Sequence, residues 1–129
     1  MNTLHLMYVA FGGAAGAMGR FALAELVARF NTSAFPFGTM MVNILGSLML
    51  GIWIGVVATM MPAKTKDLHL LIAVGFLGGF TTFSAFSMDA YMLMERGMTT
   101  QAFLYVFGSV MISVLALVAG MWLVKLLAV

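Results

Sequence analysis

The stretch GFLGGFTTFSAFS occupies residues 75–87 and lies within a longer apolar segment, from Leu68 to Leu93. Its three glycines, followed by two threonines, lower the helix propensity, and the hydroxyls can offer the backbone other hydrogen-bond partners. Backbone groups released inside a bilayer must be satisfied by protein, water or an ion. The stretch therefore predicts a membrane helix broken near midspan, whose freed carbonyls suit a hard cation. A continuous helix with glycines used for packing is the alternative.

The composition points to a membrane location. Of the 129 residues, 64% are hydrophobic and only 8% are charged. So few charges cannot cover a globular surface, whereas lipid requires none and penalises each one. A hydrocarbon core of about 30 Å is crossed by roughly 20 helical residues. We therefore predict an all-α membrane protein with one transmembrane domain over residues 1–129, whose four helices occupy about 4–29, 38–61, 67–95 and 99–127.

Turn-forming residues separate the predicted helices. Pro36 follows the first helix and Gly97 follows the third, while Pro62 and the polar run 64–67 separate the second helix from the third. The first basic residue is Arg20, inside the first span, so we expect no cleavable signal peptide. The absence of cysteine excludes disulfides and thiolate metal sites.

Glycines recur at the four-residue spacing that lets membrane helices approach closely. Four thin helices enclose little interior, so we also expect self-association. We interpret the glycine pairs as packing contacts without chemistry: Gly12 with Gly16, Gly51 with Gly55, and Gly75 with Gly79.

The basic residues give little preference for one orientation in the membrane. If the helices alternate, one side holds three basic residues in its loops and termini and the other holds two, too even for the positive-inside rule to decide. Insertion in both orientations, followed by antiparallel pairing about a two-fold axis, is the hypothesis that this suggests. A fixed orientation set by the lysines of the second loop is the alternative. The residues are Lys64, Lys66 and Lys125 on one side, and Arg29 and Arg96 on the other.

Aromatic residues recur every three positions just beyond the predicted break, at Phe80, Phe83 and Phe86. The positive edge of an aromatic ring can face an anion without a titratable group. The neighbouring hydroxyls of Thr82 and Ser84 suit a polar interior better than lipid tails. The stripe therefore predicts either helix packing or an anion path.

Two further helices carry polar stripes. In the second span, Thr39, Asn43 and Ser47 follow one another at four-residue spacing and lie on one face. A buried amide costs about 2–7 kcal/mol if it is unpaired, so the Asn43 side chain must bond another helix or a ligand. Tyr105, Ser109 and Ser113 follow one another at four-residue spacing in the fourth span and lie on one face. These hydroxyls indicate a polar track, although single serines in membrane helices usually bond their own backbone.

The charged residues offer no catalytic site. Arg20 is expected near the aqueous end of the first span, where it faces a vestibule or Asp89, or anchors the helix by snorkelling. No cluster of His, Asp and Glu has metal-ligand or acid–base spacing, so we expect no enzyme. The six basic residues are scattered and form no patch, so we expect lipid and no nucleic acid as a partner.

The segments GTMMVN at 38–43 and GGFTTFSAFS at 78–87 resemble the two signature segments of the Fluc (CrcB-type) fluoride channels. The resemblance covers nearly the whole chain. It implies a passive, fluoride-selective channel that exports cytoplasmic fluoride across the bacterial inner membrane. It also implies an antiparallel, dual-topology homodimer with two fluoride pores and a structural sodium ion at its centre.

The resemblance also implies roles for particular residues. Gly78 and Thr81 would supply backbone carbonyls to the sodium ion, and Arg20 would lie in the vestibule. Two positions depart from the family pattern, because Ala85 stands where threonine is usual and Asp89 stands where glutamate is usual. The fluoride pore would be lined by Asn43, Thr82, Phe83, Ser84, Phe86, Tyr105, Ser109 and Ser113.

Two other functions remain open at this point. A dual-topology, proton-coupled exporter of small molecules would need a titratable carboxylate near the middle of its first helix, where this chain offers only Glu25, close to the end. A structural membrane subunit without transport would not explain Asn43 and the hydroxyl stripes.

Overall fold

The computed structural model describes residues 2–60 and 65–128 of the chain. Within these ranges, four helical spans are long and apolar enough to cross a membrane, which confirms the predicted all-α membrane fold. Met61, Pro62 and Lys64, on which the predicted end of the second helix and part of the second loop depended, lie outside the described residues. The spans are α1 (Thr3–Phe30), α2 (Phe37–Met60), a third span over Lys66–Glu95, and α6 (Thr99–Leu127).

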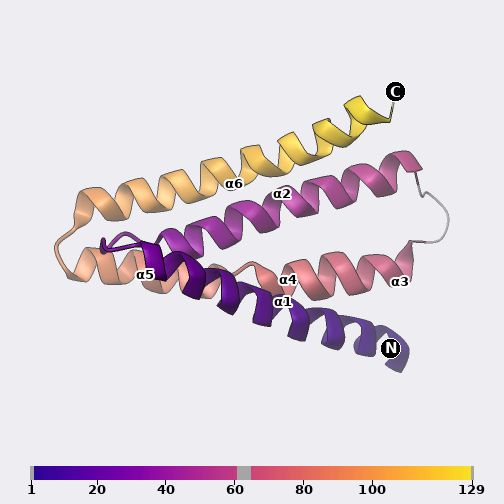
Figure 1. The fold of residues 1–129 in the computed structure, drawn as a ribbon, viewed down its shortest axis with the longest axis horizontal. Helices are drawn as coiled ribbons and strands as arrows, with labels where there is room; N and C mark the ends of the chain where they lie inside the picture. Colours follow the sequence, from indigo (N-terminus) through magenta and orange to yellow (C-terminus); the bar gives the residue numbers. More distant parts are fainter. Residues whose placement is uncertain (1, 61–64, 129) are drawn as a thin grey trace.

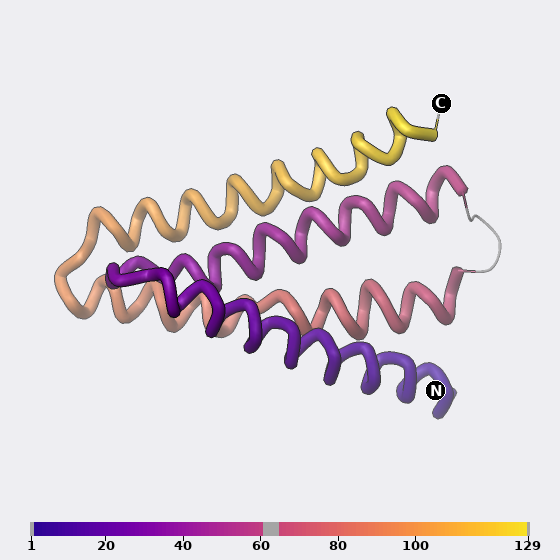
Figure 2. Tube along the Cα trace, viewed as in Figure 1, coloured from indigo at the N-terminus to yellow at the C-terminus, as the bar shows by residue number. Residues whose placement is uncertain are grey.

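The third span is interrupted, as the glycine- and threonine-rich stretch predicted. Figure 2 shows it coiled at both ends with an extended stretch near its middle. Thr81 and Thr82 belong to no helix and have extended backbone angles. The four helical pieces are α3 (Lys66–His69), the π-helix η1 (Leu70–Leu77), α4 (Gly78–Phe80) and α5 (Phe83–Glu95).

The helices pack mainly as two pairs. α1 lies against η1 and α4, and α2 lies against α6, whereas α2 makes few contacts with the third span (Figure 1). The start of α1, the end of α2 and the end of α6 lie at one end of the molecule, and the α1–α2 and α5–α6 connections lie at the other. The sparse contact between the pairs leaves room for a cavity at the level of the break.

Glycines make the close contacts within each pair. A Cβ on Gly16 of α1 would overlap the Phe76 carbonyl oxygen of η1, and a Cβ on Gly51 of α2 would overlap the backbone of Leu117 in α6. A Cβ on Gly79 would lie 2.5 Å from Gly13 O. The predicted role of the spaced glycines in helix packing is thus confirmed, because a side chain at these positions would push the helices apart.

Polar caps fix the helix ends outside the bundle interior. Asn2 accepts a hydrogen bond from Leu4 N at 3.0 Å at the start of α1. Asn31 closes the α1–α2 loop by donating from Nδ2 to Phe35 O at 2.8 Å. Gly97 takes a positive φ of 72° between α5 and α6, a conformation that glycine adopts without steric cost. The predicted turns at these two connections are confirmed.

Candidate functional site: a cavity at the helix break

The break is built by two consecutive extended residues. Thr81 has φ −76° and ψ 159°, and Thr82 has φ −150° and ψ 124°. Gly78 and Gly79 stay helical, so the chain leaves the helix just after the glycines. The hydroxyl of Thr82 then caps α5 by accepting from Ala85 N at 3.1 Å. The break is therefore an ordered turn between two helices, with its own cap.

The π-helix η1 before the break is a feature that sequence reasoning missed. Its eight residues are apolar apart from one glycine, and nothing in their order distinguishes them from an ordinary α-helix. π-Helical turns are rare and occur frequently at functional sites. Here the π-helix leads directly into α4 and the break.

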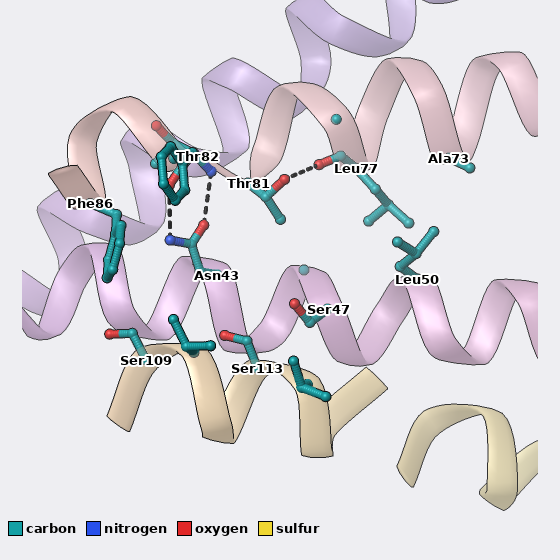
Figure 3. Close-up of a pocket in the computed structure, with 15 residues that line it drawn as sticks. Asn43, Ser47, Leu50, Ala73, Leu77, Thr81, Thr82, Phe86, Ser109 and Ser113 are labelled. Atoms are coloured by element: carbon teal, nitrogen blue, oxygen red, sulfur yellow. Dashed lines mark hydrogen bonds between the residues drawn. The ribbon is translucent and has the colours of Figure 1, made fainter. Parts of the chain in front are cut away.

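Asn43 of α2 binds the backbone of the break at two points. Its Nδ2 donates to Thr82 O at 2.9 Å, and its Oδ1 accepts from Thr82 N at 2.8 Å. Figure 3 shows both bonds side by side across the gap between α2 and the third span. The sequence required a partner for this amide, and the structure supplies one in the extended backbone.

The break leaves backbone carbonyls without their usual helical donors. In an unbroken helix the Thr82 N–H would bond to Gly78 O, but here it donates to Asn43 instead. The side chain and the N–H of Thr81 both bond to Leu77 O, at 2.9 and 3.0 Å. The expected freeing of the Gly78 carbonyl thus has a specific cause, the diversion of its donor to α2.

An open cavity of about 410 Å³ lies between α2, the third span and α6. Most of the residues predicted for the pore line it, together with both residues predicted to hold sodium. Ser47 also lines it, a residue that shares a predicted polar stripe with Asn43 but was not assigned to the site. The predicted residues that line the cavity are Asn43, Gly78, Thr81, Thr82, Phe83, Phe86, Ser109 and Ser113.

The two aromatic residues that line the cavity differ in how far the rest of the chain buries them. Phe86 is 9% exposed and packs on Tyr105, with ring centroids 5.3 Å apart. Phe83 lies 5.5 Å from Phe86 and is 79% exposed. Phe86 is therefore fixed by this chain's own core, whereas little of the described chain covers Phe83.

The two serines of α6 place unpartnered hydroxyls at the cavity. The Oγ atoms of Ser109 and Ser113 are buried, and neither has a hydrogen-bond partner among the described residues. They project from α6 toward α2 (Figure 3). A buried hydroxyl without a partner costs free energy, so two on one helix face suggest that a ligand supplies the missing bonds.

Comparison with known proteins identifies the family. Residues 7–121 match the family described as CrcB-like protein, Camphor Resistance (CrcB). The chain belongs to the CrcB family. The family membership that the two signature segments predicted is thus confirmed over residues 7–121.

Several bacterial members of the CrcB family are similar over almost their full length. Three proteins, each named fluoride-specific ion channel FluC, illustrate the range. The protein of Rhizobium johnstonii is 42% identical over 125 residues, 97% of this chain and 99% of its own length. That of Chelativorans sp. strain BNC1 is 45% identical, covering 94% and 96% of the two chains. That of Erythrobacter litoralis is 41% identical, covering 99% and 100%. The four apolar spans found in the described residues, together with these bacterial relatives, identify this CrcB-family chain as a multi-pass bacterial membrane protein.

Three residues predicted for the CrcB-type pore or vestibule do not line the cavity. Tyr105 is fully buried behind Phe86 and donates to Asp89 Oδ2 at 3.2 Å. Ser84 is exposed, with its Oγ 3.3 Å from Thr82 Oγ1. Arg20 is half-buried on α1. Tyr105 and Ser84 thus contact the cavity wall from behind or beside it.

A pairing of Arg20 with Asp89, one of the alternatives that the sequence left open, does not form among the described residues. Within residues 2–60 and 65–128, the single contact at ion-pair distance joins His5 Nε2 to Asp67 Oδ1 at 3.5 Å. Asp89 instead accepts the Tyr105 hydroxyl and lines a second, smaller cavity of about 150 Å³ together with Arg96. No carboxylate or basic side chain of the described chain lines the larger cavity.

Proposed function

We propose that this chain is a passive, fluoride-selective ion channel that exports cytoplasmic fluoride. Its relatives over nearly their full length are named fluoride-specific ion channels. The observation that carries the proposal is the cavity at the break. In the part of the chain that the structure describes, its lining combines an amide, buried unpartnered hydroxyls and aromatic rings, without a charged group. Ion transport by such a site requires no catalytic chemistry.

The lining suits a small, tightly hydrated anion. Hydroxyl and amide N–H groups can replace the water that the ion sheds, and the positive edges of Phe83 and Phe86 can face it. A fixed positive charge would hold the anion too firmly, because conduction requires sites that are weak and multiple. Among the described residues no carboxylate lines the cavity, so the site offers no group for coupled proton transport.

We also propose that two copies of the chain assemble as an antiparallel, dual-topology homodimer. The 79% exposure of Phe83 supports this, because an apolar ring that lines the open cavity needs cover that the described part of the single chain does not provide. Gly78, which lines the same cavity, is also exposed. A second copy placed about a two-fold axis would meet the same surface on itself.

The assembly proposal includes a sodium ion held by the carbonyls of Gly78 and Thr81. The freed carbonyl oxygen of Gly78 is suited to bind the ion, since oxygen ligands suit a hard cation. A two-fold axis would double the number of these ligands. When bound, the ion would compensate carbonyl dipoles that lipid cannot satisfy.

Flux measurement tests the proposed function. Purified protein is reconstituted into liposomes loaded with fluoride or chloride, and efflux is followed with ion-selective electrodes. We expect rapid fluoride efflux that persists when the pH gradient is clamped, with chloride retained. Efflux that stops under the clamp would indicate a proton-coupled exporter, and equal chloride efflux would refute selectivity.

Cation exchange tests the sodium proposal separately. Sodium is replaced on both sides by a bulky organic cation, and fluoride flux and oligomeric state are recorded after prolonged exchange. We expect flux to fall and to recover when sodium returns. Undiminished flux with an intact dimer would refute a required sodium ion while leaving the channel function standing.

A further inference from the structure

Asn43 uses most of its hydrogen-bonding capacity on the backbone of one residue. A primary amide offers two N–H donors and one carbonyl acceptor group. Oδ1 accepts from Thr82 N at 2.8 Å, and one N–H donates to Thr82 O at 2.9 Å. One N–H therefore remains for any other partner. An amide that served only as an anion ligand would not need its carbonyl and a first donor directed at the same residue.

We propose that Asn43 is a positioning residue that acts through Thr82: it holds the helix break in shape and leaves a single N–H for the cavity. This inference rests on the proposed channel function, because it concerns the same site. It assigns to Asn43 a structural task at the break in addition to contact with the transported anion.

Asn43 influences the positions of the aromatic rings through Thr82, the N-cap residue of α5. Thr82 is the residue that precedes α5, and its hydroxyl accepts from Ala85 N at 3.1 Å. Phe83 is the first residue of α5 and Phe86 lies one turn further. Because Asn43 fixes both backbone groups of Thr82, it fixes the direction in which α5 begins. The placement of both rings at the cavity therefore depends on the Asn43 amide.

α2 is also shaped to receive the residue before Thr82. Gly46 lies one turn along α2 from Asn43 and is buried. A Cβ at Gly46 would overlap Thr81 Cγ2 and would lie 3.2 Å from the Phe80 ring. Asn43 thus holds the break by hydrogen bonds, and the missing side chain of Gly46 leaves room for Thr81. Both residues lie on the same face of α2.

Thr82 can be changed at a single backbone atom to test this route. Replacing Thr82 by its α-hydroxy acid, through nonsense suppression in the full chain, turns the amide into an ester and deletes the N–H that Asn43 Oδ1 accepts. Every side chain stays in place, including the amide of Asn43. The ester also weakens the carbonyl of Thr81, a proposed sodium ligand, so flux alone does not decide the role of Asn43. A role for Asn43 as an anion ligand alone predicts unchanged hydrogen exchange at the Ala85 amide in this protein.

We expect the ester protein to lose about tenfold in fluoride flux, the change that corresponds to one lost hydrogen bond. We also expect hydrogen exchange at the Ala85 amide to rise by about the same factor, since its cap on Thr82 loosens. Asn43→Ala should raise exchange at Ala85 similarly, and adding the ester to Asn43→Ala should raise it no further. Ser47→Ala is the matched control for exchange, because Ser47 lines the same cavity but makes no hydrogen bond to the break.

Unchanged Ala85 exchange and unchanged flux in the ester protein would overturn the positioning role. Fully additive effects of the ester and Asn43→Ala would overturn it too, because they would show that the two groups act independently. If the Asn43→Ala protein does not fold, the ester protein alone still decides the question. If the wild-type protein conducts no fluoride but the ester protein still shows faster exchange at Ala85, the channel function is refuted and the positioning role is retained.

Discussion

Removal of the buried hydroxyl from Ser109 or Ser113 should stabilise the protein and impair transport at the same time. The Oγ atoms of both residues are buried and have no partner among the described residues. Ser109 is 3% exposed, so alanine would leave almost no new surface and only a small void. The effects on stability and on transport are expected to be opposite. Unpaired hydroxyls destabilise the folded protein, but they lower the energy barrier to anion passage by donating hydrogen bonds to the ion.

The expected magnitudes follow from the hydrogen bonds involved. A buried hydroxyl without a partner costs about 1–3 kcal/mol, and serine has a somewhat lower helix propensity than alanine. Ser109→Ala should therefore raise the free energy of unfolding by about 1–2 kcal/mol. A hydrogen bond to an ion is worth about 1.5–3 kcal/mol, so loss of this donor should slow fluoride flux roughly ten- to hundredfold.

Two assays on the same preparations test this prediction. Unfolding in detergent gives the change in stability, and efflux from liposomes gives the change in transport. Thr59→Ala is the control, because the Thr59 hydroxyl donates to Gly55 O at 2.8 Å and lies outside the cavity. It should be neutral or slightly destabilising, with normal flux. Serine variants that lose stability, or that conduct fluoride as fast as wild type, would show that these hydroxyls are bonded within the protein.

Four further substitutions separate packing from transport. Phe83→Ile and Phe86→Ile should both abolish fluoride flux, since isoleucine has no positive ring edge. Only Phe86→Ile should also lower the free energy of unfolding, by about 1 kcal/mol, because Phe86 packs on Tyr105. Normal efflux from both variants would leave the rings as packing alone. Gly79→Ala should destabilise the protein by about 1–3 kcal/mol, because its Cβ would meet the backbone of α1. Gly78→Ala should leave stability unchanged, since its Cβ would lie in ordinary contact, 3.7 Å from Ala73 O. Equal stability of the two alanine variants in a detergent unfolding assay would contradict the close helix contact.

The helices and the break could be predicted because each depends on local composition. Apolar length sets the four spans, and three glycines followed by Thr81 and Thr82 weaken the third one near its middle. The π-helix η1 could not be predicted, since its apolar residues would fit an α-helix equally well. η1 packs closely against α1, a contact that the sequence does not reveal.

The candidate site could be predicted as a set of residues but not as a geometry. Spacing places Ser109 and Ser113 on one face of α6, and the structure brings that face to the cavity. Spacing also placed Tyr105 on that face, but its ring packs on Phe86 and its hydroxyl donates to Asp89, outside the cavity lining. The need of Asn43 for a partner was predictable, whereas the backbone of a residue 39 positions away was not. That these residues conduct fluoride stays a prediction.

The central claim is that this chain conducts fluoride passively and selectively, and the reversal potential across a planar bilayer tests it most directly. Protein is incorporated with a tenfold fluoride gradient, equal chloride and equal pH on both sides. The account predicts a current that reverses near the fluoride equilibrium potential, about 59 mV in magnitude for a monovalent ion. A second recording then imposes a pH gradient with equal fluoride, and the reversal potential should stay near zero. Reversal near zero in the first recording, or reversal that follows the proton gradient in the second, would contradict the account.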